Sequence, residues 1–425
     1  MEKLVWRTEK RKVNDLLPCS KSVRTMSDKQ TKDLVKSIKK YNLVEIPAVD
    51  LDNKIIAGLQ RIKVLQSLNR GEEEIDIRIP NRKLTQEEYD QYMLASNAIS
   101  GDWDYDKLKD FDVSILQESG FDLSELNSVW NKTLEIKDED FNVDKELSEI
   151  KIPQTKLGDI ILLGNHKLIC GDSTKPEVLK KLFGEEKASM IYSDPVYNIN
   201  ISYNSGIGGK ANYGGNVNDN RTEEDYYNLI ENSIKRALEV SSENLHVFYW
   251  SDQSYIWLMQ TLYQKFGIQN KRVCLWIKNG HNPTPSVAFN KCYEPCTYGV
   301  IGKPYINKEI NNLNEVMNKE MTTGNNLLSE TADELDLWLT KRLSGKEYEH
   351  ATSKPPTLHE KAIRRCTKPG DIILDSFSGS GSTIIAGQQL KRRVFAVELE
   401  PVFCDLTIKR FEKLTGEKAL VIRDI

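Results

Sequence analysis

Residues 371–383 read Asp371-Ile-Ile-Leu-Asp375-Ser-Phe377-Ser-Gly379-Ser-Gly381-Ser-Thr383, and this stretch decides the fold. A short apolar run leads into a glycine turn, and a segment with a helical pattern follows it. Glycine lets a backbone approach a ligand closely, and the first amides of a helix attract a carboxylate or a phosphate. The stretch therefore predicts a strand, a ligand-binding turn and a helix.

The strand predicted next indicates what kind of ligand the turn binds. It spans Val394–Val397 and is followed by Glu398, which lies 19 residues after Gly379. An acid at this place can bind two ribose hydroxyls, so the pair predicts a nucleoside site. Ile384 stands where a dinucleotide fingerprint has Gly or Ala, and the turn lacks the lysine of a P-loop. A glycine turn without any ligand is an alternative for this stretch taken by itself.

A second predicted strand ends in a carboxylate, a proline and an aromatic residue, in the sequence Ser193-Asp194-Pro195-Val196-Tyr197. Asp194 and the carbonyl of Pro195 can each accept a hydrogen bond from the exocyclic amino group of a base. These bonds draw the nitrogen toward tetrahedral geometry and free its lone pair to attack a sulfonium methyl. Tyr197 can stack on the base once it is flipped out of the double helix. Asp-Pro is also a common turn, and that alternative stays open for this segment alone.

Strands and helices alternate along the rest of the chain. The turn at Gly164-Asn165 predicts a hairpin, and the segment that begins at Ser27-Asp28 predicts a helix. Short apolar segments separated by helix-length segments predict a mainly parallel sheet, with ligands at the carboxyl ends of its strands. The predicted strands are 46–50, 54–57, 159–163, 167–170, 189–193, 245–249, 272–277, 298–301, 372–374 and 394–397, and a further helix is predicted at 61–68.

Taken together, these stretches resemble the amino-methyltransferases of DNA, the family that modifies adenine N6 or cytosine N4. Their catalytic motif is Asp/Asn/Ser-Pro-Pro-Tyr/Phe and their cofactor motif is Phe-x-Gly-x-Gly. The catalytic motif comes first here, which resembles the β class of the family. The resemblance spans about 158–411 and implies an α/β fold, a Rossmann-like sheet that binds S-adenosylmethionine.

Two further stretches resemble elements of the same family. Residues 164–173 resemble the segment in which Asp172 lies beside the cofactor adenine, and residues 349–355 resemble the element in which Lys354 contacts the methionine end. The resemblance thus implies Asp194, Pro195 and Tyr197 as catalytic residues. The cofactor-binding residues that it implies are Asp172, Lys354, Phe377, Gly379, Gly381 and Glu398.

The chain departs from the family pattern at three positions. Val196 replaces the second proline of the catalytic motif, Ser378 replaces a common glycine and Ala351 replaces a common proline. Val196 removes one rigid φ angle but keeps both hydrogen-bond acceptors and the aromatic residue, so we expect retained activity, and a reduced rate stays open as an alternative. A catalytically decayed regulator that binds DNA stays open as an alternative.

The N-terminal part, about 13–108, resembles the ParB/sulfiredoxin-like domain through Ile55-Ile-Ala-Gly58-Leu59-Gln-Arg61. In that family the Gly-x-x-Arg turn binds nucleotide or lies in a nucleic-acid-binding surface. Leu59 replaces a common histidine, which argues against a nucleotide-binding or nuclease role here. The resemblance implies a smaller α+β domain that helps to position DNA, and a solvated Arg61 without any ligand is the alternative.

Length and charge suggest how the chain is divided. A chain of 425 residues is too long for one ordinary core. Residues 101–150 hold 5 basic and 15 acidic residues, a balance of −10, whereas 1–100 hold 19 and 15, a balance of +4. We predict a ParB-like domain at 1–110, an acidic helical segment and linker at 111–157, and a methyltransferase domain at 158–425 that includes a target-recognition region at about 302–345.

Other features limit the setting of the protein. No apolar run reaches membrane length, and seven scattered cysteines do not suggest a disulfide framework, so we expect a cytoplasmic protein. Cys292 and Cys296 have no second ligand pair at zinc spacing, so no metal is expected. The Gly- and Asn-rich loop 204–220 is predicted to close over the base or to touch DNA, and a loop without such a role is the alternative.

The expected function is transfer of a methyl group from S-adenosylmethionine to the N6 amino group of a flipped adenine in double-stranded DNA. N4 of cytosine stays open as the target, because the catalytic motif does not separate the two bases. Methylation of RNA or of a protein glutamine is disfavoured by the motif order and by the ParB-like resemblance. A homodimer stays open.

Overall fold

The computed structural model describes residues 3–18, 28–97, 103, 105–119, 121–200, 219–282, 291–310, 317 and 354–423. These residues form two compact units, Met1–Thr133 and Leu134–Ile425. The division into 1–110, 111–157 and 158–425 stays a prediction. Ser27 and most of the predicted loop 204–220 lie outside the described residues, as do most of the predicted recognition region 302–345 and residues 349–353.

The first unit contains a four-stranded sheet in the order β1-β4-β2-β3. β4 alternates exposed and buried residues, and Ile75, Ile77 and Ile79 point into a core shared with helices α1 and α2. β1 and β4 had no counterpart among the predicted strands; β1 is dominated by charged residues. The strands are β1 (Trp6–Lys12), β2 (Ala48–Val49), β3 (Ile55–Ala57) and β4 (Glu74–Pro80). The helices are α1 (Asp28–Tyr41), α2 (Leu59–Ser67), α3 (Gln86–Asn97), α4 (Tyr105–Leu108), α5 (Val113–Glu118) and α6 (Leu123–Thr133).

The second unit contains a nine-stranded sheet in the order β13-β5-β6-β12-β11-β7-β8-β10-β9. Its five central strands, β6, β12, β11, β7 and β8, are parallel, and antiparallel strands lie at both edges. The mainly parallel α/β sheet expected from the sequence is thus present. The strands are β5 (Ile160–Leu163), β6 (His166–Cys170), β7 (Ala188–Ser193), β8 (Ser241–Trp250), β9 (Gln269–Asn282), β10 (Lys291–Ile301), β11 (Ile372–Asp375), β12 (Arg393–Glu398) and β13 (Leu420–Ile422).

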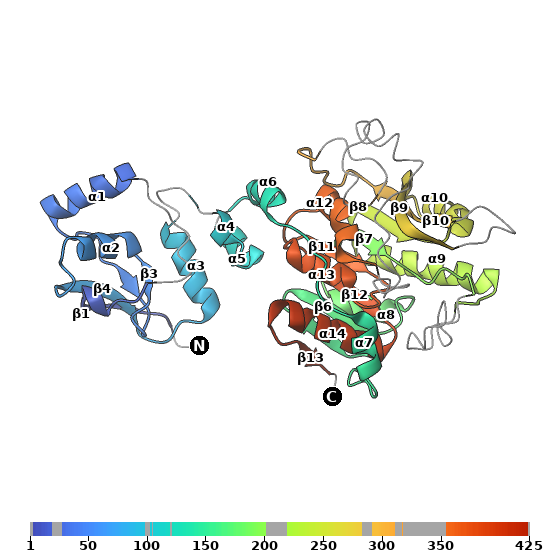
Figure 1. The fold of residues 1–425 in the computed structure, drawn as a ribbon, viewed down its shortest axis with the longest axis horizontal. Helices are drawn as coiled ribbons and strands as arrows, with labels where there is room; N and C mark the ends of the chain where they lie inside the picture. Colours follow the sequence, from blue (N-terminus) through green and yellow to red (C-terminus); the bar gives the residue numbers. More distant parts are fainter. Residues whose placement is uncertain are drawn as a thin grey trace. The chain divides into compact units, whose positions relative to one another are not determined.

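Helices cover both faces of this sheet (Figure 1). Strand β12 shows why: Val394 and Ala396 pack into the core on one face, Phe395 and Val397 pack into the core on the other, and all four are buried. One face is covered by α8 (Pro176–Phe183), α9 (Glu223–Glu239) and α10 (Ile256–Lys265). The other is covered by α12 (Glu360–Cys366), α13 (Ser382–Gln389) and α14 (Pro401–Thr415).

The chain reverses its direction across the sheet between β7 and β11. From β7 it passes through α9 to β8 on one side, whereas from β11 it passes through α13 to β12 on the other. The carboxyl ends of β7 and β11 therefore flank a topological switch point, where sheets of this kind bind their ligands.

Residues 134–157 of the predicted linker segment belong to the second unit. Ile136 is 1% exposed within the main core, and Phe141 and Val143 pack on Leu406 of α14. Helix α7 (Val143–Glu149) also contacts α14. Apolar residues spaced through the acidic sequence explain this packing, because each one buries surface that a solvated linker would expose.

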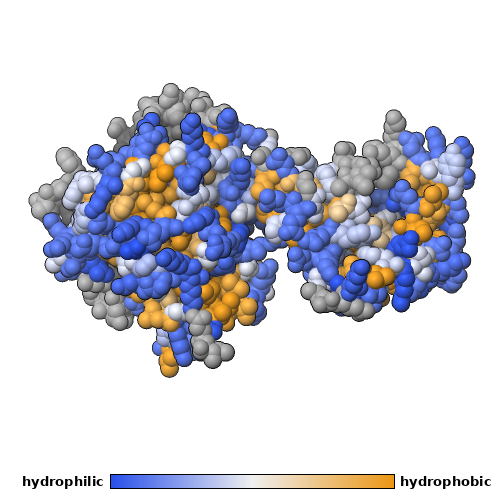
Figure 2. Space-filling view, turned by 180° about the vertical axis from the view of Figure 1, so that it is seen from behind, coloured by the Kyte–Doolittle hydropathy of each residue, from blue (hydrophilic) through white to orange (hydrophobic). Residues whose placement is uncertain are grey.

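Most predicted elements are present with shifted ends. The predicted hairpin is confirmed, since Leu163 pairs with His166 across the turn. Strands β9 and β10 are longer than predicted, because their antiparallel pairing continues beyond the apolar residues. Strand β8 begins earlier than predicted, because Ser241 pairs in parallel with Ala188 of β7. Hydrophilic residues cover most of the described face shown in Figure 2. Among the described helices, none combines the length and apolar character needed to cross a bilayer.

Candidate active site

The catalytic turn lies at the carboxyl end of β7. Asp194 and Pro195 follow the buried residue Ser193 directly. Asp194 makes two side-chain contacts: its Oδ2 lies 2.5 Å from Nζ of Lys354, and its Oδ1 accepts a hydrogen bond of 3.0 Å from the hydroxyl of Tyr197. The structure therefore brings Lys354, which the resemblance assigns to the cofactor, into contact with two of the three predicted catalytic residues.

Glu294 of strand β10 completes this arrangement. Its Oε2 lies 3.3 Å from Nζ of Lys354 and 3.1 Å from the hydroxyl of Tyr197. Nζ of Lys354 also donates to the Tyr197 hydroxyl at 2.9 Å. The side chains of Lys354, Glu294 and Asp194 are 7%, 14% and 30% exposed. We call these four residues, Asp194, Tyr197, Glu294 and Lys354, the Lys354 cluster.

Burial and charge determine the protonation states in the Lys354 cluster. Burial lowers the pKa of Lys354, but Asp194 and Glu294 outweigh burial and the pKa is raised overall. Burial, and then the same two carboxylates, raise the pKa of Tyr197 well above its ordinary value. Lys354 is therefore a cation and Tyr197 keeps its proton. The cation also lies 4.8 Å from the ring centre of Trp250.

The glycine turn lies at the carboxyl end of the neighbouring strand β11. Gly379 and Gly381 have φ angles of +52° and +78°, which side chains other than glycine rarely adopt. A Cβ at Gly381 would lie 2.6 Å from Thr407, so glycine there permits close packing on α14. A Cβ at Gly379 would meet no atom within 4 Å. The space beside Gly379 is therefore open.

Glu398 lies next to this turn, as the sequence predicted. Its Oε2 accepts the amide of Gly379 at 2.7 Å and its Oε1 accepts the amide of Glu400 at 2.8 Å. A carboxylate can accept roughly four hydrogen bonds, so acceptor capacity remains for ribose hydroxyls. Burial raises the pKa of Glu398 to about 7.

Asp375, at the carboxyl end of β11, is a second buried carboxyl in this region. It is 3% exposed and accepts the amide of Phe377 at 3.1 Å. Burial raises its pKa to about 7. No role was predicted for Asp375 from the sequence, although a charged residue that ends an apolar strand is a signal for one.

Asp172 follows β6 and lies beside the end of β12. Its Oδ1 accepts the amide and the hydroxyl of Thr174, at 2.9 and 2.7 Å, while the amide of Gly171 donates to the carbonyl of Glu398 at 2.8 Å. The predicted residues thus fall into two sets. Asp194, Pro195, Tyr197 and Lys354 lie at the end of β7, whereas Phe377, Gly379, Gly381, Glu398 and Asp172 lie at the ends of β11, β12 and β6.

The segment that precedes the large sheet, which contains Glu139, helps to support the glycine turn. Arg410 of α14 donates to the carbonyl and the hydroxyl of Ser380, at 3.0 and 3.1 Å. The same guanidinium forms an ion pair with Glu139, and the two side chains are 5% and 12% exposed. Glu139, which lies within the predicted linker, therefore fixes the position of Arg410, and Arg410 in turn supports the glycine turn.

These features fit a polar, cationic nucleoside. Two buried carboxyls with raised pKa values lie beside an open space and a helix start. Among the described residues, the buried hydroxyls of Ser251 and Ser378 have no hydrogen-bond partner, so both remain able to bind a ligand. S-adenosylmethionine offers hydroxyls, a carboxylate, an ammonium and a sulfonium to such groups.

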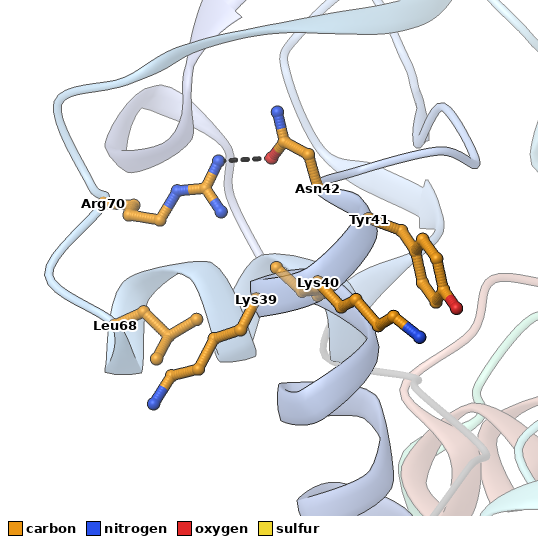
Figure 3. A pocket seen from close by; sticks show the side chains of 7 residues that line it. Lys39, Lys40, Tyr41, Asn42, Leu68 and Arg70 are labelled. Atoms are coloured by element: carbon orange, nitrogen blue, oxygen red, sulfur yellow. Dashed lines mark hydrogen bonds between the residues drawn. The ribbon is translucent and has the colours of Figure 1, made fainter.

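The first unit has a separate hollow of about 560 Å³ near the end of α1 (Figure 3). Lys39, Lys40, Tyr41 and Arg70 are among its lining residues, and Arg70 donates to Asn42 at 2.5 Å.

The Gly58 turn predicted from the sequence is present, with φ of +92° at Gly58. Arg61 of that turn forms an ion pair with Glu45. Within the described ranges, no three His, Cys, Asp or Glu side chains are grouped as metal ligands would be.

The fold, with its two turns beside the switch point of the sheet, is that of a methyltransferase. The family of DNA methylases, N6_N4_Mtase, matches residues 188–409, which is more than half of the chain. The protein belongs to this family and is a DNA methyltransferase that uses S-adenosylmethionine.

The chain is also similar to individual proteins. The type II methyltransferase M2.DpnII of Streptococcus pneumoniae is 25% identical over 278 residues, which cover 62% of this chain and 98% of that protein. The structure of the M1.HpyAVI–S-adenosylmethionine complex is 21% identical, covers 57% of this chain and 98% of that chain, and has a TM-score of 0.39. A Pnob8-like ParB-N domain is 18% identical, covers 31% of this chain and 52% of that chain, and has a TM-score of 0.23.

Proposed function

We propose that the protein methylates N6 of adenine at a specific site in double-stranded DNA, as the modification enzyme of a restriction–modification system. The observation that carries the proposal is the position of Asp194. It lies at the end of β7, beside the switch point, and its carboxylate is held by Lys354 and Tyr197. N4 of cytosine is the alternative target, because both bases present an exocyclic amino group.

Each residue of the catalytic turn has a proposed role. Bound S-adenosylmethionine supplies an electrophilic methyl group. Asp194 and the Pro195 carbonyl accept hydrogen bonds from the amino group of the base, and Asp194 can receive the proton that this nitrogen sheds after transfer. The hydroxyl of Tyr197 is held by Asp194 and Glu294, so the orientation of its ring is set before a base stacks on it.

The proposed cofactor residues lie around the glycine turn and at neighbouring strand ends. Glu398 binds the ribose, Asp172 lies beside the adenine, and Lys354 faces the methionine end. Phe377 packs beside the cofactor, and the backbone at Gly379 and Gly381 approaches it closely. The open space at Gly379 and the partially used carboxylate of Glu398 support these roles.

The first unit, which we propose to be a ParB-like domain, contacts the DNA backbone. Helix α1 contains five lysines and two aspartates, a balance of +3. Lys36, Lys39 and Lys40 are exposed. Lys39 and Lys40 follow Lys36 by three and four residues, which places them on the same face of the helix as Lys36. Phosphate groups are the natural partners of such a face.

The test is methyl transfer by the wild-type protein and by Asp194→Ala. Incubation with DNA and labelled S-adenosylmethionine, followed by mass spectrometry of the deoxynucleosides, should give N6-methyl-2′-deoxyadenosine for wild type. Asp194→Ala should lower the rate by roughly a hundredfold or more, because it removes an acceptor that acts on the reacting nitrogen. Calorimetry should show its affinity for S-adenosylhomocysteine, whose sulfur is neutral, nearly unchanged.

Other outcomes would identify the alternatives. N4-methyl-2′-deoxycytidine would assign the other base. Cofactor and DNA binding without any product would support the decayed regulator. A wild-type rate in Asp194→Ala would contradict the catalytic role of Asp194.

A further inference from the structure

Glu294 has no assigned role, although it lies in the Lys354 cluster. It comes from β10, an antiparallel strand on the far side of β8 from the catalytic turn. Its side chain is 14% exposed and contacts both Lys354 and Tyr197. A buried carboxylate loses much of its hydration, so it is retained only where nearby donors or cations compensate.

The charges of the Lys354 cluster do not cancel. Two carboxylates share one ammonium, and the tyrosine is neutral, so the formal charge is −1. Without Glu294, Lys354 and Asp194 would form a closed ion pair with no net charge. The cation would then face a single partner, and the carboxylate of Asp194 would be less available to a base.

We propose that Glu294 is a positioning residue for methyl transfer, which draws Lys354 and Tyr197 away from exclusive contact with Asp194 and leaves one negative charge beside the reacting amino group. During transfer, positive charge passes from the sulfonium sulfur to the nitrogen of the base. A fixed negative charge at the nitrogen stabilises that change more than it stabilises the ground state. This inference rests on the proposed function, in which Asp194 binds the amino group.

The role of the charge can be separated from the role of the hydrogen bonds. Glu294→Gln keeps the size and an acceptor oxygen but loses the charge, whereas Glu294→Asp keeps the charge. The matched control is Glu186→Gln. Glu186 forms ion pairs with Lys167 and Arg393 at the amino ends of the strands, the edge opposite the site.

Two measurements test the inference. The first is kcat for DNA methylation, which should fall about tenfold or more in Glu294→Gln and recover at least in part in Glu294→Asp. The second measurement needs no turnover. It is the ratio of the affinity for S-adenosylmethionine to the affinity for S-adenosylhomocysteine, which has a neutral sulfur. This preference should fall roughly three- to tenfold in Glu294→Gln and hold in Glu294→Asp. Glu186→Gln should match wild type in both.

The outcomes separate the inference from the proposed function. If wild type methylates DNA and Glu294→Gln keeps both values, the inference is wrong and the proposed function stands. If both Glu294 variants lose activity equally with an unchanged ligand preference, Glu294 is merely structural and the inference is again wrong. If wild type transfers no methyl group, the proposed function fails, and the ligand preference alone then decides the role of Glu294.

Discussion

Two buried carboxyl groups beside the glycine turn, Asp375 and Glu398, should make cofactor binding depend on pH. Burial raises the pKa values of Asp375 and Glu398 to about 7, so in the folded protein each carboxyl favours its protonated form. Their contribution to the stability of the cofactor-free protein is therefore full below the ordinary pKa values of 3.8 and 4.5, and it is lost as pH rises to about 7. Hydroxyl donors and a cationic ligand favour the ionised form instead. Cofactor binding and the stability of the free protein should thus respond to pH in opposite directions.

Cofactor affinity should accordingly fall as pH falls through 7. Between pH 8 and pH 6 the dissociation constant should rise roughly tenfold for each carboxyl that must ionise. Glu398→Gln should weaken binding at pH 8 by roughly ten- to a hundredfold and should flatten the pH dependence, because glutamine does not titrate. Calorimetry of both proteins across this range is the measurement. A pH-independent affinity in wild type would contradict the link between ionisation and binding.

At the scale of an element, helix α1 is the proposed DNA-binding feature of the first unit. Each lysine that neutralises a phosphate contributes about 0.9 to the slope of log affinity against log salt. Replacing Lys36, Lys39 and Lys40 by alanine should therefore weaken DNA binding and lower that slope by about 2 to 3. The matched control replaces Lys10, Lys12 and Lys83, which are exposed on β1 and after β4. Gel-shift titrations at several salt concentrations make the comparison. If the two triple variants changed DNA affinity and its salt dependence equally, the proposed role of α1 would be wrong.

At the scale of the whole molecule, the segment before the sheet belongs to the catalytic unit. Ile136 and Phe141 are buried there, and Glu139 holds Arg410 behind the glycine turn. A fragment that begins at Leu134 should fold and bind S-adenosylmethionine with nearly full affinity. One that begins at Ile150 should be less stable and bind more weakly, since loss of one partner of a buried ion pair alone costs about 3–5 kcal/mol. Thermal unfolding and cofactor titration of both fragments test this. Equal behaviour of the two would show that residues 134–149 contribute nothing.

The sequence by itself determined the class of the sheet, the two turns at its carboxyl edge and the identity of the cofactor. These features depend on local patterns, in which strand, glycine turn and helix succeed one another within about a dozen residues. It did not reveal Glu294, because that residue is 97 positions from Tyr197 and reaches it only through the pairing of β10 with β8. It also did not reveal that Ile136, Phe141 and Val143, within the acidic segment predicted at 111–157, pack on α14 and the core, because few apolar residues stand among many acidic ones. Only the tertiary structure decided these points, since burial and long-range ion pairs depend on which strands become neighbours and not on the order of residues along the chain.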